Sequence, residues 1–291
     1  MINGEEIFIK TAKQYSLAAT KFISSKQANK TIVISSATGV LQKYYQKIAL
    51  HFASLGYVVY TFDYSGIGKS GSEIPQLKRN TSTLQEWGSI DQASIVQHAK
   101  DEYPNNKITL ITHSVGGQVL GFNSNYHLLE NVITVASQSG YWKEFKGIHK
   151  PKMWLFWYGI VPILTPIFGY FPAKKLGLFE NLPKAVVYEW AKWGKHKEYI
   201  AGHHNSDHTY FNKLKIPILV LSFPRDNYAP KKMVDWLASQ FTNATVDRRH
   251  LVPKELGIDE IGHFGFFREK FSDSLWKMIE EWINENKKDV Y

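Results

Sequence analysis

The sequence contains no cysteine. Disulfide bonds, thiolate nucleophiles and cysteine-ligated zinc are therefore excluded. The first ten residues, MINGEEIFIK, also lack the basic-then-apolar order of a secretion signal, so cytoplasmic residence is the default expectation. No nucleic-acid-binding motif accompanies the formal net charge of +9, and we expect no nucleic-acid partner.

The composition is that of an ordinary globular protein. Hydrophobic residues make up 44% of the 291 residues and charged residues 21%, which argues against disorder and allows one large α/β domain. The positive charge is concentrated in residues 141–200, where ten lysines face four glutamates, a difference of 10 − 4 = +6. We expect these lysines to form a solvated face.

Short apolar runs alternate with segments of helical periodicity. The runs predict strands at 6–10, 15–23, 31–35, 57–62, 107–112, 131–136, 216–222 and 245–252. Helices are expected over 45–55, 83–103, from 115 onward, over 232–241 and over 271–282; the second begins with a capping box, Thr83 and Glu86. This order predicts a mostly parallel sheet with helices on both faces, whose sites lie at the carboxyl ends of the strands.

The stretch KITLITHSVGGQ, residues 107–118, is typical of a strand, a sharp turn and a helix with Ser114 at the turn. A serine held in such a turn needs small neighbours, because strand and helix pass closely there. Gly116 and Gly117 meet this need after the serine. The pattern G-x-S-x-G is not complete, since Thr112 stands at the first glycine.

A serine hydroxyl becomes a nucleophile only when a base takes its proton and a third group orients that base. Asp226 follows the predicted strand 216–222, and His263 follows the strand 245–252 and precedes the last helix. All three residues come after strands, in the order serine, acid, histidine. We therefore predict that Ser114, Asp226 and His263 form a catalytic triad.

Two other clusters suggest ligand binding less strongly. Gly68-Lys69-Ser70 resembles the end of a phosphate-binding loop, but Asp63 occupies the position where that motif requires glycine. The stretch 203–208, HHNSDH, offers imidazoles and a carboxylate that could bind zinc. A polar loop is the favoured interpretation, because adjacent histidines point apart and the triad needs no metal. We expect neither a metal nor a cofactor.

The chain resembles the α/β-hydrolases, and more closely a bacterial group near the serine-aminopeptidase and monoglyceride-lipase types. The matching stretches are SATGV at 36–40, TFDYSGIGKS at 61–70, HSVGG at 113–117 and IGHFGFF at 261–267. The resemblance implies an α/β-hydrolase fold with a mostly parallel eight-stranded sheet, a core formed by residues 1–140 and 213–291, and a helical cap inserted at 141–212.

The same resemblance places an oxyanion hole at the backbone N–H groups of Val115 and Val40. Such amides bind the charge that develops on a tetrahedral acyl intermediate. Two residues depart from the pattern: Thr112 at the turn, and Ser65 where the family commonly has arginine. The first affects the geometry of the turn and the second only the packing of a loop.

The cap contains a run without charge, MWLFWYGIVPILTPIFGYFPA, from Met153 to Ala173. The run is long enough to raise the question of a transmembrane helix, but prolines at 162, 166 and 172 make a straight span improbable. We expect short lid helices, apolar toward a pocket and basic toward water, with Trp154, Phe156 and Trp157 lining the pocket. Contact of the cap with a membrane surface is conceivable but not expected.

These observations predict a metal-independent serine hydrolase that cleaves carboxylic esters of apolar acyl chains through an acyl-enzyme. An aminopeptidase, an amidase or an acyltransferase would use the same triad. A different class of protein, a non-catalytic binding protein of this fold, would follow if Thr112 distorts the turn. The sequence determines neither the natural substrate nor the oligomeric state.

Overall fold

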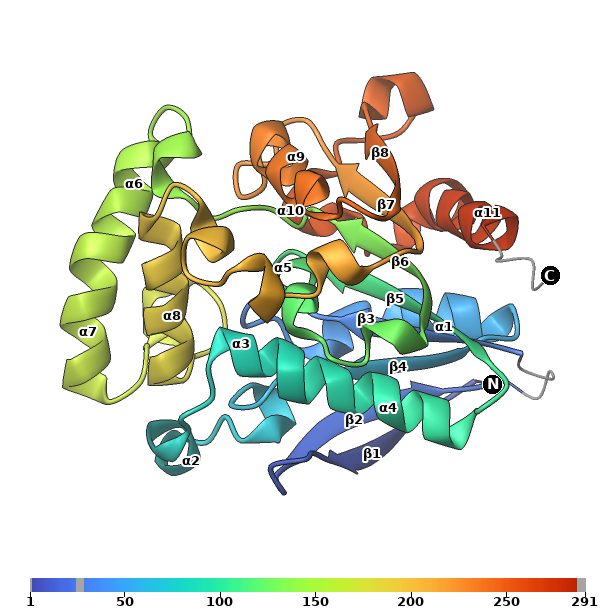
Figure 1. The fold of residues 1–291 in the computed structure, drawn as a ribbon, viewed down its shortest axis with the longest axis horizontal. Helices are drawn as coiled ribbons and strands as arrows, with labels where there is room; N and C mark the ends of the chain where they lie inside the picture. Colours follow the sequence, from blue (N-terminus) through green and yellow to red (C-terminus); the bar gives the residue numbers. More distant parts are fainter. Residues whose placement is uncertain (1, 25–28, 287–291) are drawn as a thin grey trace.

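The structure is a computed structural model that describes residues 2–24 and 29–286. Its centre is one eight-stranded sheet in the order β1-β2-β4-β3-β5-β6-β7-β8 (Figure 1). β1 and β2 are antiparallel and the other strands run parallel to one another. The strands are β1 (Gly4–Lys10), β2 (Ser16–Phe22), β3 (Lys30–Ser35), β4 (Val58–Phe62), β5 (Lys107–His113), β6 (Leu129–Val135), β7 (Pro217–Ser222) and β8 (Thr245–His250).

All eight predicted strands are confirmed, with small shifts at their ends. The central strands β4, β5 and β6 are buried along almost their whole length, whereas every described residue of the edge strand β8 keeps some exposure. This is the burial expected of a parallel sheet covered on both faces, and it explains why the central strands read as continuous apolar runs.

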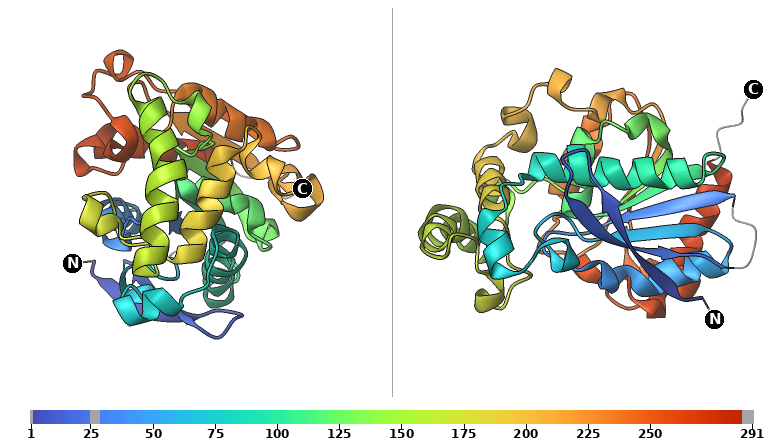
Figure 2. Two further views of the ribbon diagram at one scale, coloured as in Figure 1. Left: turned by 90° about the vertical axis from the view of Figure 1, so that its left-hand side faces the viewer. Right: turned by 90° about the horizontal axis from the view of Figure 1, so that it is seen from below.

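Helices cover both faces of the sheet. α1 (Gln46–Ser54) and α11 (Lys277–Glu285) lie on one face, and α4 (Ala93–Glu102) lies on the other (Figure 2). The predicted capping box is confirmed, because Thr83 Oγ1 accepts from the Glu86 amide and the Glu86 carboxylate accepts from the Thr83 amide. The remaining helices of the core are α2 (Ile74–Arg79), α3 (Leu84–Glu86), α5 (Val115–Val119), α9 (Lys231–Gln240) and α10 (Gly262–Gly265).

The segment 141–212, called the cap segment below, lies at the end of the sheet where the parallel strands finish (Figure 1). Its α6 (His149–Leu155), π-helical turn η7 (Phe156–Ile160) and α7 (Val161–Phe168) follow one another without interruption. α8 (Lys184–Lys195) packs beside this run on the side of the core.

The expectation of several short lid helices is therefore corrected. Pro162 stands in the first turn of α7 and Pro166 lies inside α7. The wide π turn before α7 absorbs the change in hydrogen bonding at Pro162. The run ends at Gly169, which adopts a left-handed conformation with φ 78°. Within residues 2–24 and 29–286, no helix is both long enough and apolar enough to cross a membrane.

Candidate active site

Ser114 lies between β5 and α5 in a strained conformation, with φ 51° and ψ −113°. A methyl group added at Gly116 would lie 2.6 Å from the carbonyl oxygen of Ser35, and one at Gly117 would lie 2.4 Å from Ser137 Oγ. Both distances are too short for any side chain. The glycines after Ser114 are thus required by the close approach of α5 to the neighbouring strands, which holds the serine at the apex of the turn.

Thr112, which replaces the first glycine of the pattern, fits into this turn. Its side chain is fully buried, and its Oγ1 lies 3.4 Å from Ser137 Oγ. A methyl group at Gly117 would approach the same Oγ1 to 3.0 Å. The missing side chain at Gly117 and the small one at Ser137 therefore make the space that threonine occupies.

Asp226 and His263 come together as the chain order predicts. His263 Nδ1 lies 2.9 Å from Asp226 Oδ2 and 3.1 Å from Oδ1, and both side chains are almost fully buried. The amides of Tyr228 and Ala229 donate to Asp226 Oδ1 at 2.9 and 2.8 Å. The carboxylate is held in place and accepts the Nδ1 proton, so the other ring nitrogen of His263 is left to accept a proton.

His113, the residue before Ser114, contacts His263. The rings of His113 and His263 have centroids 5.0 Å apart, and His113 Nε2 donates to the backbone oxygen of His263 at 3.0 Å. Among the described residues the Ser114 hydroxyl makes no hydrogen bond to the His263 imidazole. Such bonds are often long in enzymes without substrate and shorten only when substrate binds.

His113 continues into a chain of hydrogen bonds that sequence reasoning missed. The Ala37 amide donates to Tyr45 Oη at 2.9 Å, and Tyr45 Oη lies 2.8 Å from His113 Nδ1. Burial, and then the nearby His263, hold the pKa of His113 well below its usual range. A neutral His113 accepts from Tyr45 and donates to His263, so the chain joins the loop 36–40, the serine turn and the histidine loop. Only the position of His113 beside Ser114 pointed to this role.

The two amides predicted for the oxyanion hole differ in availability. Val115 is the first residue of α5, so its N–H has no partner within the helix. The Val40 N–H already donates to the Ala37 carbonyl at 3.1 Å. Within the same loop the Thr38 N–H donates to none of the described residues, and the buried Thr38 Oγ1 also lacks a partner there. The Thr38 N–H is thus available as a donor in this loop, whereas the Val40 N–H is already engaged.

The three residues predicted to line the substrate pocket lie in different environments. Trp154 is 48% exposed and stacks on Tyr158 at a centroid distance of 5.8 Å. The expectation that it lines a pocket is therefore corrected: α8 lies between its helix and the core. Phe156 packs against Trp157 and Phe171 inside the cap segment, and Trp157 is fully buried.

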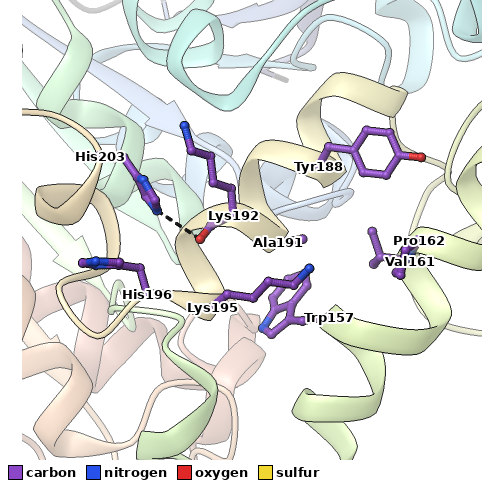
Figure 3. Close-up of a pocket in the computed structure, with 9 residues that line it drawn as sticks. All are labelled: Trp157, Val161, Pro162, Tyr188, Ala191, Lys192, Lys195, His196 and His203. Atoms are coloured by element: carbon purple, nitrogen blue, oxygen red, sulfur yellow. Dashed lines mark hydrogen bonds between the residues drawn. The ribbon is translucent and has the colours of Figure 1, made fainter.

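Trp157 does line a cavity, but that cavity lies within the cap segment. Its volume is about 370 Å³, and it lies between α7 and α8 (Figure 3). Its walls come from Trp157, Val161, Pro162, Tyr188, Ala191, Lys192, Lys195, His196 and His203. None of these residues belongs to the core, so this cavity is separate from the surroundings of Ser114.

The cap segment touches the candidate site through other residues. The Glu180 amide donates to the Gly39 carbonyl at 3.0 Å, and a methyl group at Gly39 would lie 2.8 Å from the Phe179 ring. Tyr199 Oη donates to Gln118 Oε1, in α5, at 2.8 Å. The cap segment therefore rests on both the loop 36–40 and the helix that follows Ser114, and Phe179 is its aromatic residue beside that loop.

His203 and His204, in the stretch 203–208, contact different partners. His203 Nε2 lies 3.1 Å from the Lys192 carbonyl oxygen (Figure 3), and the ring of His204 packs on Phe122 and Trp193. In the part of the chain that the structure describes, no three potential metal ligands gather at one point.

Residues 26–158 match the model of a family described as serine aminopeptidase, S33. Among solved structures, a thermostable carboxyl esterase from Bacillus coagulans superposes with a TM-score of 0.68 at 13% identity, over 98% of this chain and 99% of that chain. The esterase Pf2001 from Pyrococcus furiosus gives 0.63 at 15%, over 98% and 92%. Dipeptidyl peptidase 4 from Porphyromonas gingivalis gives 0.59 at 15%, over 98% of this chain and 36% of that chain. No curated protein matches the chain.

Proposed function

We propose that the chain, which has the fold of the esterases described above and matches the serine aminopeptidase, S33, model over residues 26–158, is a serine hydrolase that cleaves carboxylic esters. The observation that carries the proposal is the strained Ser114 at the strand–helix turn. It directly follows His113, which contacts a buried His263 whose Nδ1 lies 2.9 Å from Asp226. A nucleophile, a base and an orienting acid are the groups that acyl transfer needs.

In the proposed reaction, Ser114 Oγ attacks the ester carbonyl carbon while His263 Nε2 takes the hydroxyl proton. Asp226 stabilises the imidazolium, which then gives the proton to the departing alcohol and leaves an acyl-serine. A water molecule, deprotonated by the same nitrogen, attacks the acyl-serine and releases the acid. The N–H of Val115 and that of Thr38, in place of Val40, bind the oxyanion in both steps.

The acyl group is proposed to be apolar. Its support is the aromatic contact between the cap segment and the loop 36–40, where Phe179 lies against Gly39 and its ring centroid is 6.4 Å from that of Phe171. Each methylene buried there adds about 0.8 kcal/mol to binding. We expect kcat/KM to rise with chain length over several carbons, and Phe179→Trp to shorten the preferred chain.

A fluorophosphonate probe tests the nucleophile directly. Wild type should be labelled, and Ser114→Ala should not. Ser139→Ala is the matched control, because Ser139 is also buried and lies just beyond the end of the neighbouring strand β6. Labelling that persists in Ser114→Ala, or that Ser139→Ala removes, would show that another residue is the nucleophile.

A second candidate is hydrolysis of an amide or peptide bond, which is favoured by the family model that matches residues 26–158. Turnover of aminoacyl anilides that exceeds turnover of matched esters would favour it. The alternative of a non-catalytic binding protein was based on Thr112, and it loses that basis because Thr112 fits beside Gly117 and Ser137. Absence of labelling in folded wild type would restore it.

A further inference from the structure

The helical run α6–η7–α7 and the residue before it carry six exposed apolar side chains, called the cap ridge. The left view of Figure 2 looks onto this run, which forms the outermost layer of that end of the molecule. The ridge residues and their exposed fractions are Ile148 62%, Trp154 48%, Leu155 50%, Tyr158 45%, Ile163 58% and Ile167 70%. Exposed apolar side chains gathered on one helical run mark an interaction surface.

The opposite side of the same run is already buried. Trp157, Val161 and Thr165 are at most 1% exposed, so the run packs on the protein with one stripe and presents the other to the outside. The charge-free run has apolar residues on both stripes, and α8 packs against only one of them. The ridge side chains therefore stay exposed when the cap segment is packed on the rest of the protein.

The ridge is bordered by lysines. Lys146, Lys150 and Lys152 are exposed, and the structure pairs none of them with a carboxylate of a described residue. Lys195 Nζ lies 4.7 Å from the centroid of the Tyr158 ring and also lines the cavity between α7 and α8 (Figure 3). Cations therefore stand both at the start of the ridge and along its side.

The four glutamates of the cap segment are all engaged. Glu144, Glu180 and Glu198 pair with lysines at 2.7, 2.6 and 3.8 Å, and Glu189 accepts from the Gln85 amide at 2.8 Å. With Asp207 as its one aspartate, the cap segment has an excess of 10 − 5 = +5 positive charges, which its own side chains do not balance. A second copy of this chain, packed ridge to ridge about a two-fold axis, would bring like charges together.

We infer that the cap ridge docks on an anionic lipid surface. The ridge side chains enter the boundary between headgroups and acyl chains, with Trp154 and Tyr158 at the depth that aromatic side chains prefer. The lysines keep their stems on the apolar surface and their ammonium groups among the lipid phosphates. This surface goes beyond the proposed hydrolysis and does not depend on it.

Vesicle sedimentation of the full chain carrying Ser114→Ala tests the inference independently of turnover. Phosphatidylcholine vesicles that contain phosphatidylglycerol should bind the protein, with an affinity that falls as salt is added, and pure phosphatidylcholine vesicles should bind it far less. Leu155→Ser with Ile163→Ser and Ile167→Ser should lower the affinity at least about tenfold. Phe8→Ser, on β1 and 59% exposed, is the matched control and should change nothing.

A second set of variants, in which lysines are replaced by glutamates, tests the contribution of charge to vesicle binding. Lys150→Glu with Lys152→Glu should lower binding by at least about 25-fold, because each lysine near an anionic surface is worth about fivefold. Lys47→Glu with Lys277→Glu is the control. It makes the same change of net charge on the core, where these side chains are 60% and 66% exposed, and should lower binding only slightly. Equal losses in both pairs would show that only net charge matters and would overturn the inference.

Binding to both kinds of vesicle alike, or ridge variants that bind as wild type does, would also overturn it. Sedimentation velocity without lipid tests the alternative that a second copy of this chain packs on the cap ridge. Self-association that the three serine substitutions abolish would assign the ridge to contact between copies of this chain instead. Thermal unfolding of each variant should match that of wild type, since all the substituted side chains are exposed.

Discussion

The core and the cap segment hold their aromatic side chains in different ways. In the core, the buried aromatic side chains beside Ser114 have hydrogen-bond partners, as in the chain from Ala37 through Tyr45 to His113. In the cap segment the indole N–H groups of Trp157 and Trp193 are buried without a partner among the described residues, while Trp154 is half exposed. Hydrogen bonds thus fix the orientation of these core side chains, whereas Trp157 and Trp193 are held by packing and Trp154 stays half exposed.

The largest effect on activity should come from substitutions in the candidate triad of the core. Ser114→Ala and His263→Ala are each expected to lower kcat by about 10⁴-fold or more, with Asp226→Asn nearly as severe. The measurement is ester hydrolysis under saturating substrate. Full activity in Asp226→Asn would show that the acid is misassigned.

Next in size is a contrast within the cap segment. Trp157 is fully buried and its indole lies against Gly194, so Trp157→Ala should lower the free energy of unfolding by about 3 to 5 kcal/mol. Trp154→Ala is the matched control on the same helical run and should change it by no more than about 0.5 kcal/mol. Denaturant titration measures both. Similar losses would mean that Trp154 is also packed.

The buried carboxyl group of Asp91, in the core, should make the free energy of unfolding depend on pH. Asp91 is fully buried beside Tyr15 and the Ser65 amide, and burial raises its pKa from 3.8 to about 7. The folded state therefore holds this proton more tightly than the unfolded state. Its contribution to stability is present below pH 4 and is lost as the pH rises through about 7.

The difference between wild type and Asp91→Asn isolates this effect, because asparagine resembles the protonated carboxyl. Relative to the variant, wild type should lose up to about 4 kcal/mol of unfolding free energy between pH 4 and pH 7, at 1.36 kcal/mol per pKa unit. Urea titrations at several pH values measure it. A difference that does not vary with pH would show that Asp91 ionises normally in the folded state.

The sequence predicts the core better than the cap, for a physical reason. Strands covered on both faces leave apolar runs, and the residues that follow them meet at one edge of the sheet. The turn at Ser114 and the contact between Asp226 and His263 could therefore be predicted. The helical run of the cap segment is apolar on two stripes, and periodicity cannot tell which stripe is buried. Trp154 was misplaced for that reason. The hydrogen bond that occupies the Val40 amide depends on loop geometry, which leaves no pattern in the sequence.

The smallest predicted effect tests whether the core's hydrogen bonds position the site. His113→Phe keeps a ring in place but removes the bonds to Tyr45 and to the His263 carbonyl, so that carbonyl loses its donor. We expect kcat to fall about 10- to 100-fold with KM little changed, because the His263 loop is no longer held. Tyr45→Phe removes only the bonds to Ala37 and His113 and should have a smaller effect in the same direction.

A merely structural role of His113 would reduce the amount of active protein and not its turnover. Titration with a slow fluorophosphonate counts the competent sites, and the end point should equal that of wild type in both variants while kcat per site falls. If kcat per site is unchanged and only the number of sites decreases, His113 contributes to folding alone. The site would then owe its geometry to the turn at Ser114 and to Asp226, without the link that His113 makes between the three loops.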